Sequence, residues 1–259
     1  MEFIGIIPAR YDSVRFSGKP LIDLGGKSMI VRTYEQVSRV KKLSKVVVAT
    51  DDERIYQEVI SAGGNAVMTA RTHTSGTERC AEALSILGCE PNSTIVLNIQ
   101  GDEPFIQPEQ IAELMTCFDD PTVEIATLIK QIKTEEMLHN SNVVKAVVAD
   151  TGKALYFSRY SVPFLRNGSF ENTVFYKHIG IYAYRAKVLN EIVNLPPSSL
   201  EKAESLEQLR WLQAGYKIQT LETHYEDTIG IDTPQDLELL KRKKIFSTHN
   251  NHTCLSVLL

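Results

Sequence analysis

The sequence of 259 residues has few of the features that mark small secreted or membrane proteins. It holds 4 cysteines, Cys80, Cys89, Cys117 and Cys254, with no C-x-x-C pair and no histidine at zinc-finger spacing. Neither a disulfide scaffold nor a structural zinc is therefore expected. No apolar run approaches the roughly 18 residues of a membrane span, and the apolar N-terminus lacks a basic segment and is broken by Pro8. We expect a cytoplasmic protein with free thiols.

An excess of charge of one sign is also missing. The chain has 28 basic and 32 acidic residues, which give a formal net charge of -4. Proteins that hold nucleic acid neutralise its phosphates with Lys and Arg, so this balance argues against a nucleic-acid partner. It leaves room for a locally basic pocket that takes one small polyphosphate. The hydrophobic share of 43% is typical of a globular protein and excludes disordered and fibrous classes.

Short apolar runs alternate with amphipathic stretches over about the first 120 residues. The predicted strands are 3–8, 45–49, 66–68 and 95–99, and the predicted helices are 28–40, 52–62, 77–87 and 108–118. Alternating strands and helices predict a parallel sheet with right-handed crossovers. Ligands bind beyond the carboxyl ends of such strands, so the residues after Pro8, Ala49 and Ile99 are the first candidates for a site.

The pattern changes after about residue 120. Longer strands, some antiparallel, are predicted at 123–131, 143–150, 153–158 and 177–184, and helices at 200–214 and 234–244. We interpret the chain as one α/β domain. Residues 1–120 form mainly a nucleotide-binding half, residues 121–244 form mainly a substrate lobe, and residues 245–259 are an unassigned tail.

Three cations follow the first predicted strand: Arg10, Arg15 and Lys19. Arginine binds phosphate oxygens through two parallel hydrogen bonds and lysine adds a compact charge, so this loop could hold a triphosphate. A solvated basic loop is an equally good interpretation of the charge alone. The nearby Gly26-Lys27-Ser28 resembles the end of a Walker A loop, but the first glycine of that motif would fall at Leu21.

Two carboxylates are candidate metal ligands. Asp102 follows the fourth predicted strand, directly after Gly101. Mg²⁺ takes one or two protein carboxylates together with substrate phosphates, which suits a single aspartate at a strand end. A turn-capping role is the alternative for Asp102. Asp232 lies two residues before Pro234, where it can also cap a helix, and the two roles are compatible there.

His178 alternates with Ile179 and Ile181 in an apolar run, and a hydrogen-bonded strand histidine is the ordinary interpretation of such a position. Arg79, Arg159 and Glu207 are equally ambiguous when taken singly. The sequence has no Ser/His/Asp grouping and no H-E-x-x-H pattern, so it gives no support to covalent hydrolase or zinc-protease chemistry.

Several segments are far more specific together than singly. They are Ile7-Pro8-Ala9-Arg10-Tyr11-x-Ser13-x-Arg15-x-x-Gly18-Lys19-Pro20-Leu21, Ser75-Gly76-Thr77-Glu78-Arg79 and Gln100-Gly101-Asp102-Glu103-Pro104, followed by residues 156–159, 178–182, 204–210 and 230–234. With these segments in this order, the sequence resembles the 3-deoxy-manno-octulosonate (KDO) cytidylyltransferase family over about residues 3–244. Phe16-Ser17 stands where the family usually has a proline before Gly-Lys, and the tail after Lys244 has no family pattern.

The resemblance implies a Rossmann-like nucleotidyltransferase fold, with a mixed, mostly parallel sheet and a smaller substrate-binding and dimerisation region. It implies nucleotide binding by Ala9, Arg10, Ser13, Arg15, Lys19, Arg79 and Gln100. It implies a magnesium site at Asp102 and Asp232, and these two carboxylates with Arg15 and Lys19 form the expected catalytic set. It implies sugar binding by Arg159, His178, Tyr182, Glu207 and Gln208, with Arg159 opposite the sugar carboxylate.

The implied reaction joins CTP and KDO into CMP-KDO and pyrophosphate, for lipopolysaccharide biosynthesis, with Mg²⁺ as cofactor. The anomeric 2-hydroxyl of KDO attacks the α-phosphorus, and we expect the metal rather than His178 to promote ionisation of that hydroxyl. The resemblance also implies a homodimer, and we expect neither a nucleic-acid partner nor membrane insertion. Activation of another acidic or amino-modified sugar by CTP is the alternative reaction. A nucleotide-binding regulator without turnover would keep the basic loop but would not need both carboxylates.

Overall fold

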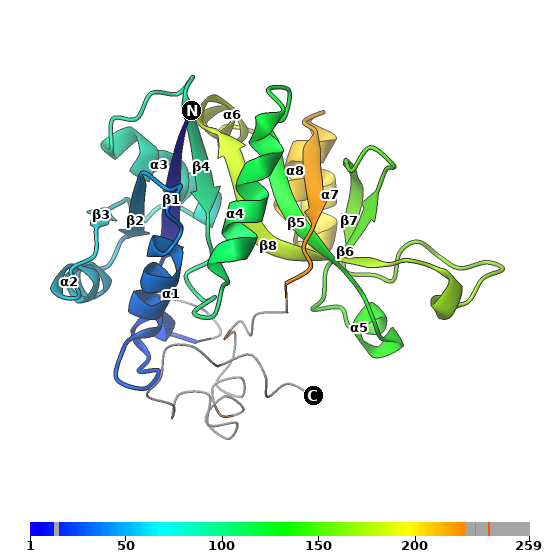
Figure 1. Cartoon of the computed structure of the whole chain (residues 1–259), viewed down its shortest axis with the longest axis horizontal. Coiled ribbons are helices and arrows are strands. Elements are labelled where there is room, and N and C mark those ends of the chain that lie inside the picture. The colour runs from blue at the N-terminus through cyan, green and yellow to red at the C-terminus, as the bar shows by residue number, and fades with distance from the viewer. Residues whose placement is uncertain (13–15, 226–230, 232–237, 239–259) are drawn as a thin grey trace.

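The computed structural model describes residues 1–12, 16–225, 231 and 238, and it shows one mixed sheet between two layers of helices (Figure 1). In this part of the chain the sheet has 9 strands, in the order β3-β2-β1-β4-β8-β5-β9, with β6 and β7 attached beside β8. None of the helices in these ranges has both the length and the apolar character needed to cross a membrane.

The first half of the sheet is parallel, as predicted. It consists of β1 (Glu2–Ala9), β2 (Lys45–Thr50), β3 (Ala66–Met68) and β4 (Thr94–Asn98). These runs are rich in β-branched residues, and β4 is buried along its whole length, as expected for a strand covered on both faces. The predicted strands and helices before residue 120 are all confirmed, each within two residues at either end.

The second half of the chain adds antiparallel strand pairs to the sheet. Its strands are β5 (Ile125–Gln131), β6 (Lys145–Val148), β7 (Ala154–Ser158), β8 (Tyr176–Arg185) and β9 (Ile218–Glu222). β8 runs antiparallel to both β4 and β5, and a tight turn between Val148 and Ala154 joins the antiparallel strands β6 and β7. β9 was not predicted, because its five residues alternate polar and apolar side chains too briefly to stand out from a loop.

Helices cover both faces of the sheet (Figure 1). They are α1 (Met29–Ser38), α2 (Glu53–Ser61), α3 (Gly76–Ile86), α4 (Pro108–Thr116), α5 (Glu135–His139), α6 (Ala186–Ile192), α7 (Ser199–Glu204) and α8 (Gln208–Gln213). Apolar side chains of α1, α2 and α4 form one core with the sheet, and those of α3, α6 and α8 form another. β1 and β4 are parallel neighbours, so their carboxyl ends lie at the same edge of the sheet, where the fold class places a site.

The single helix predicted over 200–214 is wrong, because the chain breaks into α7 and α8. Ser205 adopts a left-handed conformation with φ of 51° and ends α7. α7 has no buried side chain, whereas α8 buries Leu209 and Trp211 against the sheet. The break therefore lets α8 turn its apolar face to the core. The helix predicted at 234–244 and the tail 245–259 lie outside the described residues, apart from Glu238 in a helical turn.

Candidate active site

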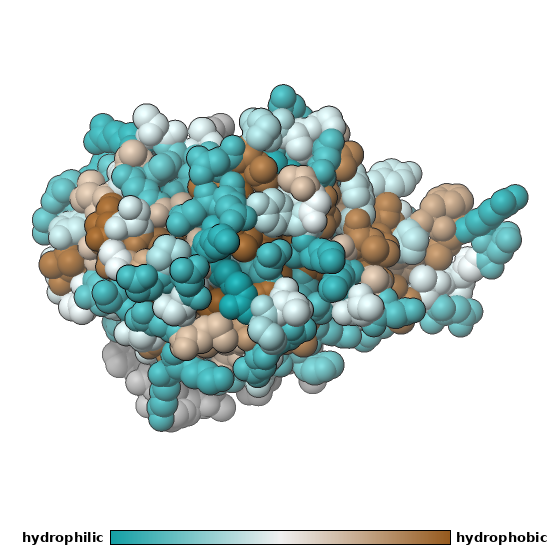
Figure 2. Space-filling model, turned by 90° about the horizontal axis from the view of Figure 1, so that it is seen from above, coloured by the Kyte–Doolittle hydropathy of each residue, from teal (hydrophilic) through white to brown (hydrophobic). Residues whose placement is uncertain are grey.

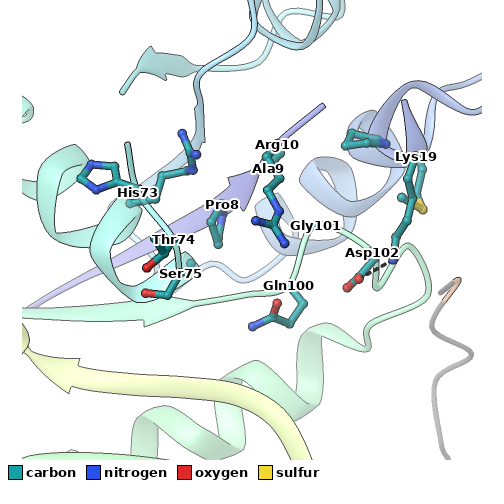
Figure 3. Close-up of a pocket in the computed structure, with 14 residues that line it drawn as sticks. Pro8, Ala9, Arg10, Lys19, His73, Thr74, Ser75, Gln100, Gly101 and Asp102 are labelled. Atoms are coloured by element: carbon teal, nitrogen blue, oxygen red, sulfur yellow. Dashed lines mark hydrogen bonds and ion pairs between the residues drawn. The ribbon is translucent and has the colours of Figure 1, made fainter. Parts of the chain in front are cut away.

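A polar pocket lies where β1 and β4 end, at the edge that the sequence indicated (Figure 3). We call it the basic pocket. Of the residues predicted to bind nucleotide or metal, it is lined by Ala9, Arg10, Lys19, Arg79, Gln100 and Asp102. The Arg10 side chain extends from the end of β1 toward the space between Gln100 and Asp102 (Figure 3). Residues far apart in the sequence therefore meet at one strand edge, as the fold class predicts.

Lys19 and Asp102 form an ion pair in this pocket, with 2.7 Å between the Lys19 Nζ and the Asp102 Oδ2 (Figure 3). Lys19 is 8% exposed, and it begins a short 3₁₀ turn directly after Gly18. Gly18 has a φ of 73°, and a Cβ at this position would crowd the Tyr11 ring. The Gly18 amide donates to the Tyr11 carbonyl at 2.9 Å, which closes the loop and fixes where Lys19 enters the pocket.

Arg79 reaches the basic pocket from α3 and is buried. Its guanidinium donates to the Thr69 hydroxyl at 2.5 Å and forms an ion pair with Asp51 at 2.9 Å. Thr69 and Asp51 follow β3 and β2, so Arg79 ties the ends of these two strands to the start of α3. Its charge is already balanced by Asp51, which makes it a fixed cation at the base of the pocket.

His73, Thr74 and Ser75 also line the basic pocket, although the sequence did not predict them as site residues. Ser75 caps α3 in a capping box: its hydroxyl accepts from the Glu78 amide, and the Glu78 carboxylate accepts from the Ser75 amide. This S-x-x-E spacing lies inside the family segment 75–79, and a capping box there indicates a helix start beside Arg79. His73 Nε2 contacts the Glu82 carboxylate at 2.5 Å, which anchors the loop to the same helix.

A second pocket adjoins the first, and we call it the inner pocket. It is lined by four of the predicted sugar-binding residues, His178, Tyr182, Glu207 and Gln208, together with Asn98 and Thr77, which were not predicted. Gly76 and Gln100 line both pockets. The two pockets therefore share a border at Gly76 and Gln100.

Burial changes the acid–base character of the inner pocket. Desolvation lowers the pKa of His178 to about 3, so its imidazole is neutral at physiological pH. Its Nε2 lies 3.0 Å from the Thr127 hydroxyl, which is also within hydrogen-bond distance of the Ile181 carbonyl at 2.7 Å and of the Ile179 carbonyl at 3.2 Å. Burial also raises the pKa of Glu207, whose carboxylate accepts from the Thr77 hydroxyl at 2.8 Å.

Aromatic packing fixes the Tyr182 ring at the base of the inner pocket. Its centroid lies 5.8 Å from that of Tyr184 in a stacked arrangement, and 5.1 Å from Trp211 edge-on. His178 lies 5.2 Å away on the other side. A ring held by three neighbours offers a rigid apolar surface to a ligand, at little entropic cost on binding.

Arg159 lies outside the linings of both pockets. It follows β7, and its guanidinium donates to the carbonyls of Glu204, Ser141 and Ser205 at 2.9, 3.2 and 3.4 Å. Ser205 immediately precedes Leu206, which lines the inner pocket. The predicted carboxylate-binding arginine thus contacts the residue that precedes the lining segment 206–208 along the chain.

Three of the predicted site residues, Ser13, Arg15 and Asp232, lie outside the described residues. The residue before Asp232 is described: Ile231 is buried beside Leu24 and Met29, and its amide donates to the Asp102 carbonyl at 3.2 Å.

Comparison with known proteins places this chain among the nucleotidyltransferases. Residues 4–218 match the cytidylyltransferase family model. A 3-deoxy-manno-octulosonate cytidylyltransferase from Parabacteroides distasonis is 54% identical over 246 residues, which span 92% of this chain and 96% of the relative. The enzyme of the same name from Thermodesulfovibrio yellowstonii is 47% identical over 250 residues, 93% of this chain and 98% of the relative.

Solved structures agree with the sequence matches. The structure of a CMP:2-keto-3-deoxy-manno-octonic acid synthetase complexed with CTP has a TM-score of 0.87 and 42% identity, and the match covers 96% of this chain and all of the other. A 4-diphosphocytidyl-2C-methyl-D-erythritol synthase from Anaerococcus prevotii, at 18% identity and a TM-score of 0.61, covering 93% of this chain and 98% of the other, shares the fold. The chain belongs to the 3-deoxy-manno-octulosonate cytidylyltransferase family.

Proposed function

We propose that this chain transfers CMP from CTP to the anomeric 2-hydroxyl of KDO, giving CMP-KDO and pyrophosphate. The observation that carries this proposal is the junction of the two pockets at Gly76 and Gln100. One pocket is cationic and suits a triphosphate, and the other is lined by hydrogen-bonding and aromatic side chains that suit a sugar. The two substrates can therefore meet at the edge of the sheet.

In the basic pocket, Arg10 and Lys19 bind triphosphate oxygens, together with Ser13 and Arg15 of the same loop. Transfer of a nucleotidyl group needs little covalent help from the protein, so alignment and charge stabilisation carry most of the acceleration. Lys19 is buried and has a fixed neighbour in Asp102. Its ammonium is thus held at one point of the pocket rather than moving freely in solvent, which is what stabilisation of developing charge requires.

Magnesium fits the chemistry of this edge. The Asp102 side chain is 33% exposed and lines the basic pocket beside Lys19. Within the described ranges no group of three or more His, Cys, Asp or Glu could hold a metal alone. This suits an ion that takes one or two carboxylates and completes its shell with substrate phosphates. Asp102 and Asp232 would hold Mg²⁺, which when bound neutralises phosphate charge and lowers the pKa of the attacking hydroxyl.

In the inner pocket, the side chains orient the sugar rather than remove its proton. His178 is neutral, with a pKa of about 3, and its Nε2 is engaged by the Thr127 hydroxyl. Tyr182 offers its fixed ring to the sugar, and Glu207 and Gln208 face the sugar hydroxyls. Arg159 pairs with the sugar carboxylate, since a guanidinium can bind both oxygens of a carboxylate.

The active molecule is a homodimer in this proposal. Large hydrophobic side chains are exposed on the lobe formed by β6, β7 and residues 160–175: Leu155 at 60%, Tyr160 at 75%, Phe164 at 81% and Val174 at 53%. Hydrophobic surface gathers over this end of the molecule in Figure 2. A second copy of the chain is the occupant, because the lobe lies in the region that the family resemblance assigns to dimerisation. Because it uses CTP, we place the protein in the cytoplasm.

Pyrophosphate release from each of the four ribonucleoside triphosphates, with and without KDO, tests the function. Release is expected only when CTP, KDO and Mg²⁺ are present together. Turnover with ATP at a rate equal to that with CTP, or release without any sugar, would overturn the assignment. Equal turnover with other acidic sugars would broaden the substrate class.

A further inference from the structure

Lys145 is the most deeply buried cation that the proposed reaction leaves unexplained. It lies at the start of β6 and is 0% exposed. Its ammonium donates to the carbonyls of Asn140, Val143 and Arg159 at 3.0, 2.6 and 2.6 Å. An ammonium has three donors, so all of them are used on backbone oxygens and none on a carboxylate. Such a group is costly to bury, which raises the question of what it holds in place.

The Arg159 main chain is held from both sides. Lys145 donates to its carbonyl, and its amide donates to the Glu204 Oε2 at 2.9 Å. The other Glu204 oxygen accepts from the Ser158 hydroxyl at 2.7 Å. The carboxylate nearest to Arg159 in this network is therefore bound to neutral donors.

Backbone carbonyls likewise hold the Arg159 guanidinium, at Glu204, Ser141 and Ser205. We call these three oxygens the carbonyl cradle. Among the described residues, Arg159 forms no ion pair. Its direction is fixed by neutral acceptors, and no carboxylate pairs directly with the guanidinium, whereas Asp51 pairs directly with Arg79.

The helix break at Ser205 makes the carbonyl cradle possible. In a continuous helix, the carbonyls of Glu204 and Ser205 would accept from the amides four residues later. Here the Leu209 amide donates instead to the Leu206 carbonyl at 3.2 Å. The two earlier carbonyls are thereby left to Arg159. A left-handed conformation is strained for a residue with a Cβ such as Ser205. This strained residue lies at the helix break that frees the carbonyls of Glu204 and Ser205.

The cradle is continuous with the inner pocket. Leu206, Glu207 and Gln208 follow Ser205 directly and line that pocket. On the other side, the amide of His178 donates to the carbonyl of Val144, the residue before Lys145, at 2.8 Å. A shift of Lys145 or of the turn at Ser205 would therefore move Arg159 relative to the sugar side chains.

We propose that Lys145 is a positioning residue for the sugar. Together with the turn at Ser205, it holds Arg159 in the carbonyl cradle, where the guanidinium has no direct carboxylate partner among the described residues and an acidic group of the substrate can supply one. This inference rests on the proposed function, in which the sugar carries a carboxylate. The sugar carboxylate then binds to the Arg159 guanidinium, which is already held in one position in the folded protein. Binding therefore costs little side-chain entropy.

The first test replaces Lys145 by Met, which keeps the length of the chain and removes the three donors. We expect KM for KDO to rise by about tenfold or more while KM and Kd for CTP stay within about twofold. Lys153→Met is the matched control, because Lys153 is exposed on the β6–β7 hairpin, and it should behave as wild type. Unchanged KM for KDO in a folded Lys145→Met protein would overturn the proposal, as would equal losses for both substrates.

A double-mutant cycle tests whether Lys145 acts through Arg159. Arg159→Ala should raise KM for KDO at least as much as Lys145→Met does. The double variant should be little worse than Arg159→Ala alone, since nothing is left to position. Independent, multiplying losses would show that Lys145 has only a structural role and would overturn the proposal.

If Lys145→Met does not fold, two variants of the exposed Ser205 decide the question. Ser205→Gly keeps the left-handed turn at no steric cost and should match wild type, whereas the β-branched Ser205→Val disfavours it and should raise KM for KDO. Equal kinetics of the two would overturn the proposal. Wild-type enzyme that released pyrophosphate without an acidic sugar would instead show that the proposed function has failed.

Discussion

Lys19 places a positive charge at a fixed position in the basic pocket. It is buried, it follows Gly18 in a left-handed conformation that glycine adopts without strain, and it touches the Asp102 carboxylate. Lys19→Ala removes a fixed positive charge from the place where negative charge develops on the leaving pyrophosphate. We expect kcat/KM to fall by about 10²-fold or more, and a similar loss for Arg15→Ala.

Lys27→Ala is the matched control for this prediction. Lys27 also forms an ion pair, with Glu35 at 2.6 Å, but both side chains are about half exposed. Surface pairs of this kind contribute little, so steady-state kinetics should not change. Near-wild-type kcat/KM in Lys19→Ala would mean that the loop after β1 is only a solvated surface.

Asp102 carries a separate prediction, because an amide binds Mg²⁺ far more weakly than a carboxylate. Asp102→Asn should lower kcat and raise the Mg²⁺ concentration needed for half-maximal rate, whereas Lys19→Ala should leave that concentration nearly unchanged. Asp232→Asn should act in the same way as Asp102→Asn. Asn is itself a good helix cap, so thermal stability should be kept.

The double variant that combines Asp102→Asn with Asp232→Asn tests whether the two carboxylates act together. If both carboxylates serve one metal–substrate assembly, the fold-loss of kcat/KM in the double variant should be much smaller than the product of the two single fold-losses. Asp23→Asn, in an exposed turn, is the control and should be fully active. Full activity of Asp102→Asn at ordinary Mg²⁺ would place the metal elsewhere.

His178 makes a prediction about pH and stability. Its pKa is about 3 in the folded protein and about 6.5 in an unfolded chain. The unfolded state therefore binds the proton more tightly, and the free energy of unfolding falls as pH drops below about 6.5 toward 3, by up to about 1.4 kcal/mol per pH unit. Urea unfolding at pH 7.5 and 5.5 should show a loss about 1 kcal/mol larger in wild type than in His178→Gln. Equal losses would mean that His178 is solvated.

At the scale of elements, the sequence predicted what local patterns decide. Strands such as Lys45–Thr50 are continuous apolar runs, and helices such as Gly76–Ile86 have a capping signal and helical spacing. The break at Ser205 was not predictable in this way, because residues 200–214 are good helix formers. It arises from burial: Leu209 and Trp211 reach the core only if α8 leaves the line of α7.

The same contrast between local sequence patterns and three-dimensional contacts applies to the site residues. The basic loop and Asp102 were found because they follow strands, and the rule for parallel sheets needs no side-chain detail. Asn98 and Thr77 were missed because a polar residue at a strand end or in a first helical turn is ordinarily structural. Lys145 was missed because a lysine in a strand, here inside the apolar run 143–148, is normally solvated. Only the three-dimensional contacts distinguish it.

At the scale of the whole molecule, the inner pocket lies where the sheet changes direction. β8 runs antiparallel beside both β4 and β5, and it carries His178 and Tyr182 to the end of β4. The parallel half of the sheet thus supplies the basic pocket, and the antiparallel half supplies much of the inner pocket. The division of roles between residues 1–120 and 121–244 stays a prediction.

The proposed dimer is tested at this scale. Phe164 is 81% exposed and contributes no buried core area, so Phe164→Glu should leave the fold intact while placing a charge in the hydrophobic patch. Light scattering after size exclusion should give the dimer mass for wild type and the monomer mass for this variant. Lys42→Glu, at an exposed position before β2 and outside the lobe of β6, β7 and residues 160–175, is the control and should remain dimeric. A monomeric wild-type protein would exclude the homodimer.

The central claim is that two adjoining pockets bring the 2-hydroxyl of KDO to the α-phosphorus of CTP. Phosphorus NMR of a reaction with CTP, Mg²⁺ and KDO labelled with ¹⁸O at the 2-hydroxyl measures this most directly. The account predicts one CMP-KDO and one pyrophosphate for each CTP consumed, with the label in the oxygen that joins the sugar to phosphorus and none in pyrophosphate. Inorganic phosphate as the product, or label in pyrophosphate, would contradict it.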